Sequence, residues 1–159
     1  MLTVNIICIG KLKEKYLESA IEEYSKRLTS VCKFNIIELS EERLPDSPSE
    51  TQIKKAVEAE SNRILDKISK GDFVFSMCIE GKNISSQKLS EKLEKVSFDH
   101  SVVDFIIGGS YGLSNELKVR SDFKLSLGLM TFPHQLCRVI LSEQIYRAFQ
   151  ISKNTKYHK

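Results

Sequence analysis

Three segments of the chain combine residue types that can bind a ligand or move a proton. The first is the glycine-rich run Gly108–Gly112, which directly follows an apolar stretch. The second is the apolar run Leu127–His134, and the third is the ending Tyr157-His158-Lys159. In the ending, an aromatic ring, an imidazole and an ammonium group are suited to stacking, proton transfer and phosphate pairing. Each segment also has a structural interpretation, as a tight turn, a buried connection and a frayed chain end.

The glycine run lies where open α/β sheets bind ligands, after a strand that the sequence predicts to be buried. Gly108, Gly109 and Gly112 permit positive φ angles and a close approach of the backbone to a ligand. Their spacing is G-G-x-x-G rather than G-x-G-x-x-G, and no acidic residue ends a following strand to hold a ribose. A dinucleotide site is therefore disfavoured, and the chain also lacks the G-x-x-x-x-G-K-[ST] phosphate loop.

The apolar run is predicted to lie between a strand and a helix. Its Leu, Met and Phe side chains can enclose a flat heterocycle, while its backbone amides and carbonyls read the polar edge of that ring. Met77, near the end of a predicted strand, can wall the same cavity, although a strand methionine also serves as core.

The sequence gives little indication of a metal site or of a catalytic nucleophile. The four cysteines are far apart and form no C-x-x-C pair, and the three histidines are scattered. We expect reduced thiols and no metal site. An enzyme with these residues would act by positioning its reactants, using an activated cofactor.

The elements that must position these segments follow from periodicity. Residues 2–9, 32–39, 73–79, 102–107 and 123–127 are predicted strands, and residues 11–28, 114–120 and 136–149 are predicted helices. Ser49 and Gln52 fit a capping box for a helix that continues to Gly71, and Ser85 or Ser86 caps a helix through Val96. Residues 40–48 are a predicted loop and residues 80–83 a predicted polar turn.

Strands that alternate with helices predict a single α/β domain over residues 1–159, with a mostly parallel sheet covered on both faces. A length of 159 residues is enough for a core without disulfides or metals. The helix over 136–149 is apolar around most of its circumference, which favours a second copy of the protein as its outer cover.

The charge is unevenly distributed along the chain. The net charge is only +3, yet the residues from Lys118 to the end carry eight basic and two acidic side chains. This asymmetry indicates either a polyanionic partner or a solvated basic surface. No apolar run is long enough to span a membrane, and the N-terminal pattern is not that of a signal peptide, so we expect a cytoplasmic protein.

Several segments together resemble a known family. They are V-N-I-I-C-I-G-K-L-K-E-K from Val4, F-I-I-G-G-S-Y-G-L from Phe105, L-S-L-G-L-M-T-F-P-H-Q-L-C-R-V from Leu125, E-Q-I-Y-R-A from Glu143 and the terminal Y-H-K. The combination is similar to ribosomal RNA large subunit methyltransferase H, a family of the SPOUT superfamily. The resemblance covers the whole chain. It implies a SPOUT-type sheet with a C-terminal trefoil knot, S-adenosylmethionine as cofactor, a homodimer, and N3-methylation of a pseudouridine in helix 69 of 23S rRNA on the assembled 70S ribosome.

The resemblance also implies roles for individual residues. The cofactor pocket falls on Met77, Gly108, Leu127, Gly128, Leu129, Met130, Thr131 and Phe132. The positions used for catalysis are Arg147, Tyr157 and His158, with His158 as a candidate general base. The rRNA phosphates would be bound by Arg138, Arg147, Lys153, Lys156 and Lys159.

Two other classes of function remain compatible with parts of the sequence. A non-catalytic RNA-binding or ribosome-binding module would use the basic C-terminal third but has no need for the glycine and apolar runs. An oxidoreductase with a nucleotide cofactor would need an acidic ribose partner, which the sequence does not offer.

Overall fold

The computed structural model describes all 159 residues and is built around one sheet of five parallel strands. The spatial order of the strands is β2-β1-β4-β3-β5. The strands are β1 (Thr3–Ile9), β2 (Lys33–Leu39), β3 (Phe73–Asn83), β4 (Val102–Ile107) and β5 (Phe123–Ser126). The predicted α/β fold with a parallel sheet is confirmed.

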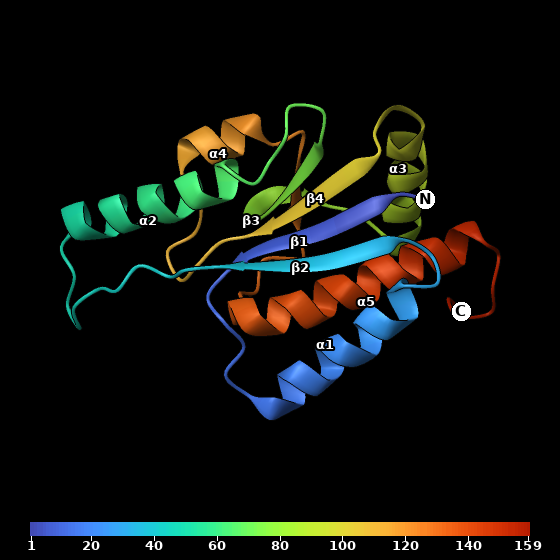
Figure 1. Cartoon of the computed structure of the whole chain (residues 1–159), viewed down its shortest axis with the longest axis horizontal. Helices are drawn as coiled ribbons and strands as arrows, with labels where there is room; N and C mark the ends of the chain where they lie inside the picture. Colours follow the sequence, from blue (N-terminus) through green and yellow to red (C-terminus); the bar gives the residue numbers. More distant parts are fainter.

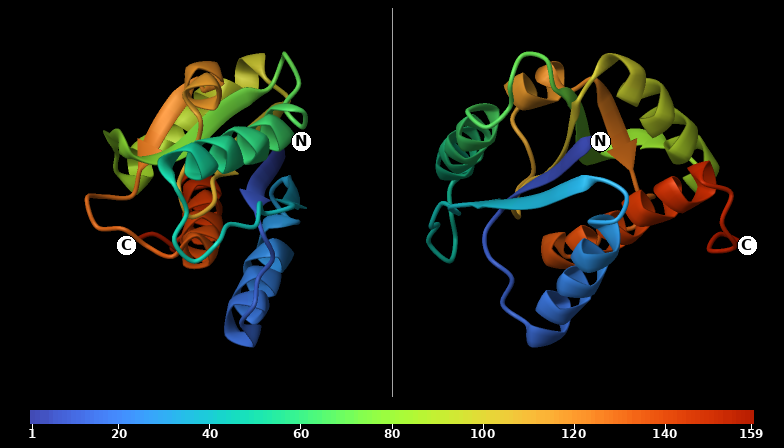
Figure 2. Two further views of the ribbon diagram at one scale, coloured as in Figure 1. Left: turned by 90° about the vertical axis from the view of Figure 1, so that its left-hand side faces the viewer. Right: turned by 45° about the vertical axis from the view of Figure 1, so that its right-hand side comes forward.

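Five helices cover the two faces of this sheet. They are α1 (Lys15–Leu28), α2 (Glu50–Leu65), α3 (Ser86–Asp99), α4 (Asn115–Arg120) and α5 (His134–Ser152). Figures 1 and 2 show α1 and α5 on one side of the sheet and α2 and α4 on the other. The side chains of α3 join the core on the side of α5.

The core has two parts because successive side chains of a strand point to opposite faces. The larger part contains Val103 and Phe105 of β4 with residues from α3 and α5. The smaller part contains Ile106 of the same strand, packed with Ile64 of α2 and Leu117 of α4. Both faces are apolar, as expected for a parallel sheet covered on both sides.

Local capping signals set the starts of three helices. Ser49 and Gln52 form the predicted capping box of α2. Ser85 accepts a hydrogen bond from the backbone of Lys88 at the start of α3, and Ser114 does the same for Leu117 at the start of α4. Each side-chain oxygen satisfies a backbone N–H that has no partner within its helix.

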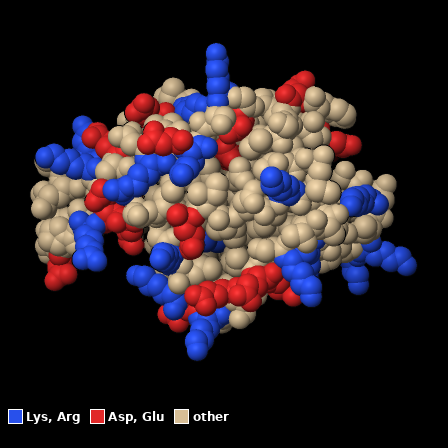
Figure 3. Space-filling model, viewed as in Figure 1, with Lys and Arg blue, Asp and Glu red and all other residues tan.

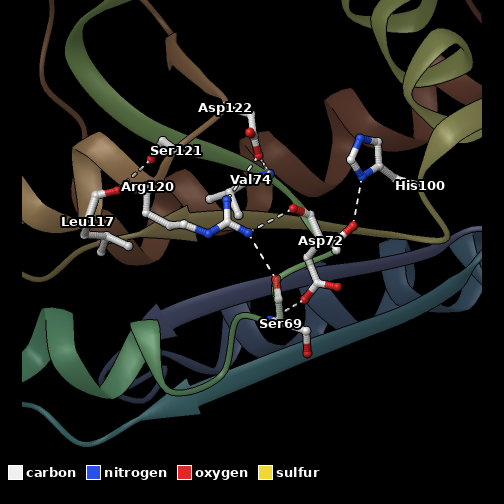
Figure 4. A network of polar contacts seen from close by, with 9 residues as sticks. Ser69, Asp72, Val74, His100, Leu117, Arg120, Ser121 and Asp122 are labelled. Carbon is white, nitrogen blue, oxygen red and sulfur yellow. Dashed lines mark hydrogen bonds and ion pairs between the residues drawn. The ribbon is translucent and has the colours of Figure 1, made fainter.

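Two helix boundaries differ from the prediction, and long-range contacts hold the residues beside them. Helix α1 starts at Lys15 rather than at residue 11, and in the segment before it the N–H of Lys13 donates to the Gln135 side chain at 3.0 Å. Helix α2 ends at Leu65 rather than near Gly71. The turn after it is held by Arg120, whose guanidinium donates to the carbonyls of Ser69 and Asp72 (Figure 4).

The predicted polar turn over residues 80–83 belongs instead to β3. This strand is irregular, because Met77 and Lys82 both pair with Leu125 of β5 while the residues between them leave the ladder. The segment 78–81 is therefore a wide bulge. The sequence suggested a turn because glycine, asparagine and charged residues are typical of turns and bulges alike.

Helix α5 is covered more fully by its own chain than predicted. It packs against α1, α3 and the sheet, and none of the residues before Ser152 is exposed. Several of its apolar side chains, among them Val139, Ile140 and Phe149, are only partly buried, so a second copy of the protein as a further cover remains a prediction.

Candidate active site

A cavity of about 410 Å³ lies at the carboxyl ends of β3, β4 and β5, between the glycine loop 108–112 and the loop 127–133. Open α/β sheets bind ligands at this edge. Of the predicted cofactor residues, seven line it: Met77, Gly108, Leu127, Gly128, Met130, Thr131 and Phe132. Leu129 does not, and its side chain is 90% exposed.

The glycine loop is folded so tightly that a side chain has no room at Gly108. A Cβ there would lie 2.7 Å from the Cδ2 of Leu113 and 2.9 Å from the carbonyl oxygen of Gly112. Gly112 has a φ of +85°, which side chains disfavour. The loop thus brings bare backbone to the cavity wall.

The second loop presents unpaired backbone donors and exposed apolar side chains. None of the N–H groups of residues 129–132 donates to another protein atom. Met130 is 77% exposed and Phe132 is 40% exposed, although both line the cavity. Apolar walls with free amides beside them can hold a flat heterocycle and read its polar edge.

Several lining residues were not predicted from the sequence. Glu80 and Cys78 reach the cavity from the bulge of β3, Lys118 from α4, and His134 and Cys137 from the start of α5. Burial raises the pKa of the Cys137 thiol to about 11, so it stays protonated and is not a nucleophile near neutral pH. Only His134 had a sequence signal, since it ends the apolar run.

The C-terminal residues form a polar cluster with the end of α5. The Glu143 carboxylate accepts from the Tyr157 hydroxyl at 3.1 Å and from Arg147 Nη2 at 2.6 Å. Arg147 also lies over the Tyr157 ring, 4.9 Å from its centroid. The ending is therefore anchored rather than frayed.

His158 lies between two side chains of this C-terminal cluster. Arg147 Nη1 lies 3.1 Å from its Nδ1, and the side-chain nitrogen Nε2 of Gln87 lies 2.8 Å from its Nε2. A guanidinium can only donate, so Nδ1 accepts and the ring proton sits on Nε2. With the proton on Nε2, the Gln87 amide accepts from it after a rotation that brings its oxygen, in place of its nitrogen, to face the ring.

Within one chain, the structure does not bring the predicted catalytic residues to the cavity. Arg147, Tyr157 and His158 are absent from its lining. His134 lines the cavity at the start of α5, and Arg147 lies about 20 Å farther along that helix. In Figure 1, the C-terminus follows the other end of α5.

A family model described as "Predicted SPOUT methyltransferase" matches residues 2–158. The chain belongs to the SPOUT methyltransferase family. A solved structure, a probable methylase family protein from Haemophilus influenzae Rd KW20, shares the fold with a TM-score of 0.56 at 15% identity. The match covers 98% of this chain and 70% of that one.

Two curated relatives place this SPOUT methyltransferase more narrowly. Ribosomal RNA large subunit methyltransferase H of Oenococcus oeni is 46% identical, with both chains covered completely. The protein of that name from Streptococcus pneumoniae (strain CGSP14) is 49% identical over 98% of this chain and 99% of its own. The chain is thus a member of the methyltransferase H family, as the sequence resemblance indicated. This membership decides against an oxidoreductase and against a non-catalytic module.

The cofactor of this SPOUT methyltransferase is S-adenosylmethionine. The cavity fits it: the volume of about 410 Å³ lies within the range of small-molecule sites. Its apolar wall and the free amides of residues 129–132 suit the adenine ring. The residues present therefore agree with the cofactor that the family uses.

The prediction that Arg138 binds RNA is wrong. Its side chain is fully buried in this SPOUT methyltransferase. It donates to the Glu38 carboxylate at 2.7 Å and to the carbonyl oxygens of Ile9 and Gly10 at 3.0 and 2.8 Å. Because this guanidinium is buried and bonded within the chain, an RNA phosphate cannot reach it.

The basic C-terminal third carries less free charge than its composition suggests. Four of its basic side chains form ion pairs within the methyltransferase: Lys118, Arg120, Arg138 and Arg147. Lys124, Lys153, Lys156 and Lys159 form none. On the face drawn in Figure 3, basic and acidic side chains are interspersed, so no single basic patch dominates that face.

Two further features of this methyltransferase concern metals and membranes. No group of three or more His, Cys, Asp or Glu side chains is arranged to hold a metal ion. None of its helices is both long enough and apolar enough to cross a bilayer.

Proposed function

We propose that this methyltransferase transfers a methyl group from S-adenosylmethionine to N3 of a pseudouridine in helix 69 of 23S rRNA, within the assembled 70S ribosome. The observation that carries the proposal is the full-length identity of 46% and 49% to relatives named for methylation of large-subunit ribosomal RNA. The choice of nucleotide and of the assembled ribosome extends the sequence resemblance.

The cofactor site that we propose is the cavity at the carboxyl edge of the sheet. Met77 walls it from β3, Gly108 lets the glycine loop approach the ligand, and Leu127–Phe132 hold the adenine. Within that last segment, Leu129 contributes through its backbone, because its side chain points to solvent.

Bound S-adenosylmethionine supplies a methyl group already activated by a positively charged sulfur. The protein must then align the target nitrogen with that methyl group and accept the N3 proton. His158 is the proposed base, with Tyr157 and Arg147 holding its position. Because Arg147 occupies Nδ1, proton uptake at that atom requires the guanidinium to move away, which pairing with an RNA phosphate would achieve.

A homodimer would bring the cofactor cavity of one chain next to the proposed base, His158, of the other chain. The C-terminal cluster lies outside the cavity of its own chain, so the tail of one protomer would complete the site of its partner. The trefoil knot implied by the resemblance remains a prediction, as does the cytoplasmic location.

We assign RNA binding mainly to the basic side chains that form no ion pair within the chain. Lys153, Lys156 and Lys159 are free to meet phosphates, and Arg147 joins them when it leaves His158. Recognition would also rely on the dimer surface and on the shape of the ribosome. Binding should weaken as salt rises.

Transfer of a labelled methyl group from S-adenosylmethionine tests the reaction and the substrate together. The substrates are 70S ribosomes that lack the modification, with free 23S rRNA and a helix 69 oligonucleotide alongside. Label at one pseudouridine of the ribosome alone supports the proposal. Efficient methylation of the oligonucleotide would contradict the need for the assembled ribosome.

A mixed dimer tests the shared site. One chain carries Gly108→Arg, which blocks its cavity, and the other carries His158→Ala, which removes the proposed base. If the tail acts across the dimer, the mixed dimer keeps one complete site and about half of the wild-type rate. If the tail serves its own chain, the mixed dimer is as inactive as either parent.

A further inference from the structure

Two oppositely charged side chains lie together in the lining of the cavity. The Nζ of Lys118 lies 2.5 Å from the Oε1 of Glu80. All other lining residues are apolar, glycine, serine, threonine or tyrosine, apart from the titratable His134 and the two thiols. The ion pair is thus the one place in this cavity that offers both a full positive and a full negative charge.

The fold places Glu80 there through the bulge of β3. Residues 78–81 leave the ladder with β5 between Met77 and Lys82. Gly81 lies so close to β5 that a Cβ would come within 2.7 Å of the Lys124 carbonyl group, which leaves room only for glycine. Bulges often occur next to active sites, where they redirect side chains, and this one turns Glu80 toward the cavity.

Lys118 reaches the same point from α4 and lines the same cavity. Its side chain is mostly buried, while that of Glu80 is more than half exposed, so the pair lies at the rim. The hydrogen bond from Lys118 lowers the pKa of the Glu80 carboxyl, which is therefore ionised near neutral pH. Both charges are present when a ligand enters.

S-adenosylmethionine ends in an α-ammonium and an α-carboxylate group. Moving these charges out of water is costly unless they meet partners of opposite charge. We infer that Glu80 and Lys118 bind this amino-acid end, with Lys118 pairing with its carboxylate and Glu80 with its ammonium group. The inference rests on the proposed placement of the cofactor in this cavity. It places the amino-acid end of S-adenosylmethionine at the cavity rim.

Two ligands that differ only at this end separate the inference from a structural role of the pair. S-adenosylhomocysteine carries the amino-acid group, and 5′-methylthioadenosine lacks it. Their dissociation constants are measured by titration calorimetry with the wild type, Lys118→Met and Glu80→Gln. The Lys118→Met variant should bind S-adenosylhomocysteine about tenfold or more weakly, and 5′-methylthioadenosine within about twofold of the wild type.

Further variants control for charge and for folding. Lys118→Arg keeps the positive charge and should recover most of the affinity for S-adenosylhomocysteine. Lys88→Met breaks the exposed ion pair with Glu91 on α3, outside the cavity, and should change neither affinity.

Three outcomes would overturn the inference. Equal losses for both ligands would mean that the pair only shapes the cavity, and unchanged affinities would mean that it faces away from the ligand. In both cases the cofactor site itself stands, because the wild type still binds both ligands. Binding of neither ligand to the wild type would overturn the inference together with the proposed cofactor site.

Discussion

The buried guanidinium of Arg138 and the carboxylate of Glu38 join the start of α5 to the end of β2, at a distance of 2.7 Å. The same guanidinium donates to the carbonyl oxygens of Ile9 and Gly10, where β1 ends. One side chain therefore fixes α5 to two strands of the sheet. Since α5 follows directly on the loop 127–133, Arg138 also sets where that wall of the cavity begins.

Replacing Arg138 is expected to destabilise the fold. In Arg138→Met, two backbone carbonyls and the Glu38 carboxylate lose their donors, so the free energy of unfolding should fall by about 3 kcal/mol. Urea denaturation measures this change. Arg43→Ala, an exposed arginine without an ion pair, is the matched control and should change stability by less than about 0.5 kcal/mol. A similarly small change in Arg138→Met would contradict the buried role.

Asp104 should make the stability depend on pH. It is fully buried on β4 and its Oδ1 accepts from Asn5, while its Oδ2 has no partner. Its pKa is raised to about 6, mainly by burial; the neighbouring Asp72 also raises it, while the hydrogen bond from Asn5 and the charge of Arg120 lower it. The unfolded value is about 4, so between pH 4 and 6 the folded state holds a proton that the unfolded state has lost. Stability therefore falls as pH rises through this window.

The variant Asp104→Asn removes this titration. Its free energy of unfolding should vary less between pH 4 and 6, and at pH 7 it should exceed that of the wild type by roughly 1–3 kcal/mol. Urea denaturation at several pH values gives the comparison. The exposed Asp99→Asn serves as control. A variant less stable than the wild type at pH 7 would show that the hydrogen bond from Asn5 outweighs the burial of charge.

Gly108→Ala should impair cofactor binding through the shape of its loop. The new Cβ would collide with Leu113 and with the Gly112 carbonyl, so the loop must shift at the cavity wall. We expect the affinity for S-adenosylmethionine to drop about tenfold or more, measured by calorimetry. Gly71→Ala meets no atom within 4 Å and should bind normally. Equal affinities for both variants would place the cofactor elsewhere.

His158→Ala should separate binding from turnover. The proposed role of His158 is to take up the N3 proton and not to hold the cofactor, so cofactor affinity should stay unchanged. Single-turnover methylation of ribosomes should slow by about 100-fold or more, as expected for loss of a general base. His100→Ala alters a histidine that contacts the Gly71 carbonyl far from both sites, and its rate should match the wild type. An unchanged rate in His158→Ala would exclude this residue from the mechanism.

Much of the fold follows from local sequence patterns. The alternation of strands and helices predicts the parallel sheet, and Ser49 with Gln52 defines the start of α2 without help from the rest of the chain. The sequence also predicts that the glycine loop and the apolar run lie at one ligand-binding edge of the sheet. Each follows a strand, and the carboxyl ends of parallel strands meet at one edge.

The tertiary structure alone decided which charges are free and which side chains share a site. Sequence composition counts Arg138 as a basic residue like Lys153, yet its partner Glu38 lies 100 positions away. Glu80 and Lys118 come together only because the bulge of β3 and helix α4 lie side by side in the folded chain. Local periodicity reports whether a segment can be a helix or a strand. Burial and charge pairing depend on neighbours that only the folded chain brings near.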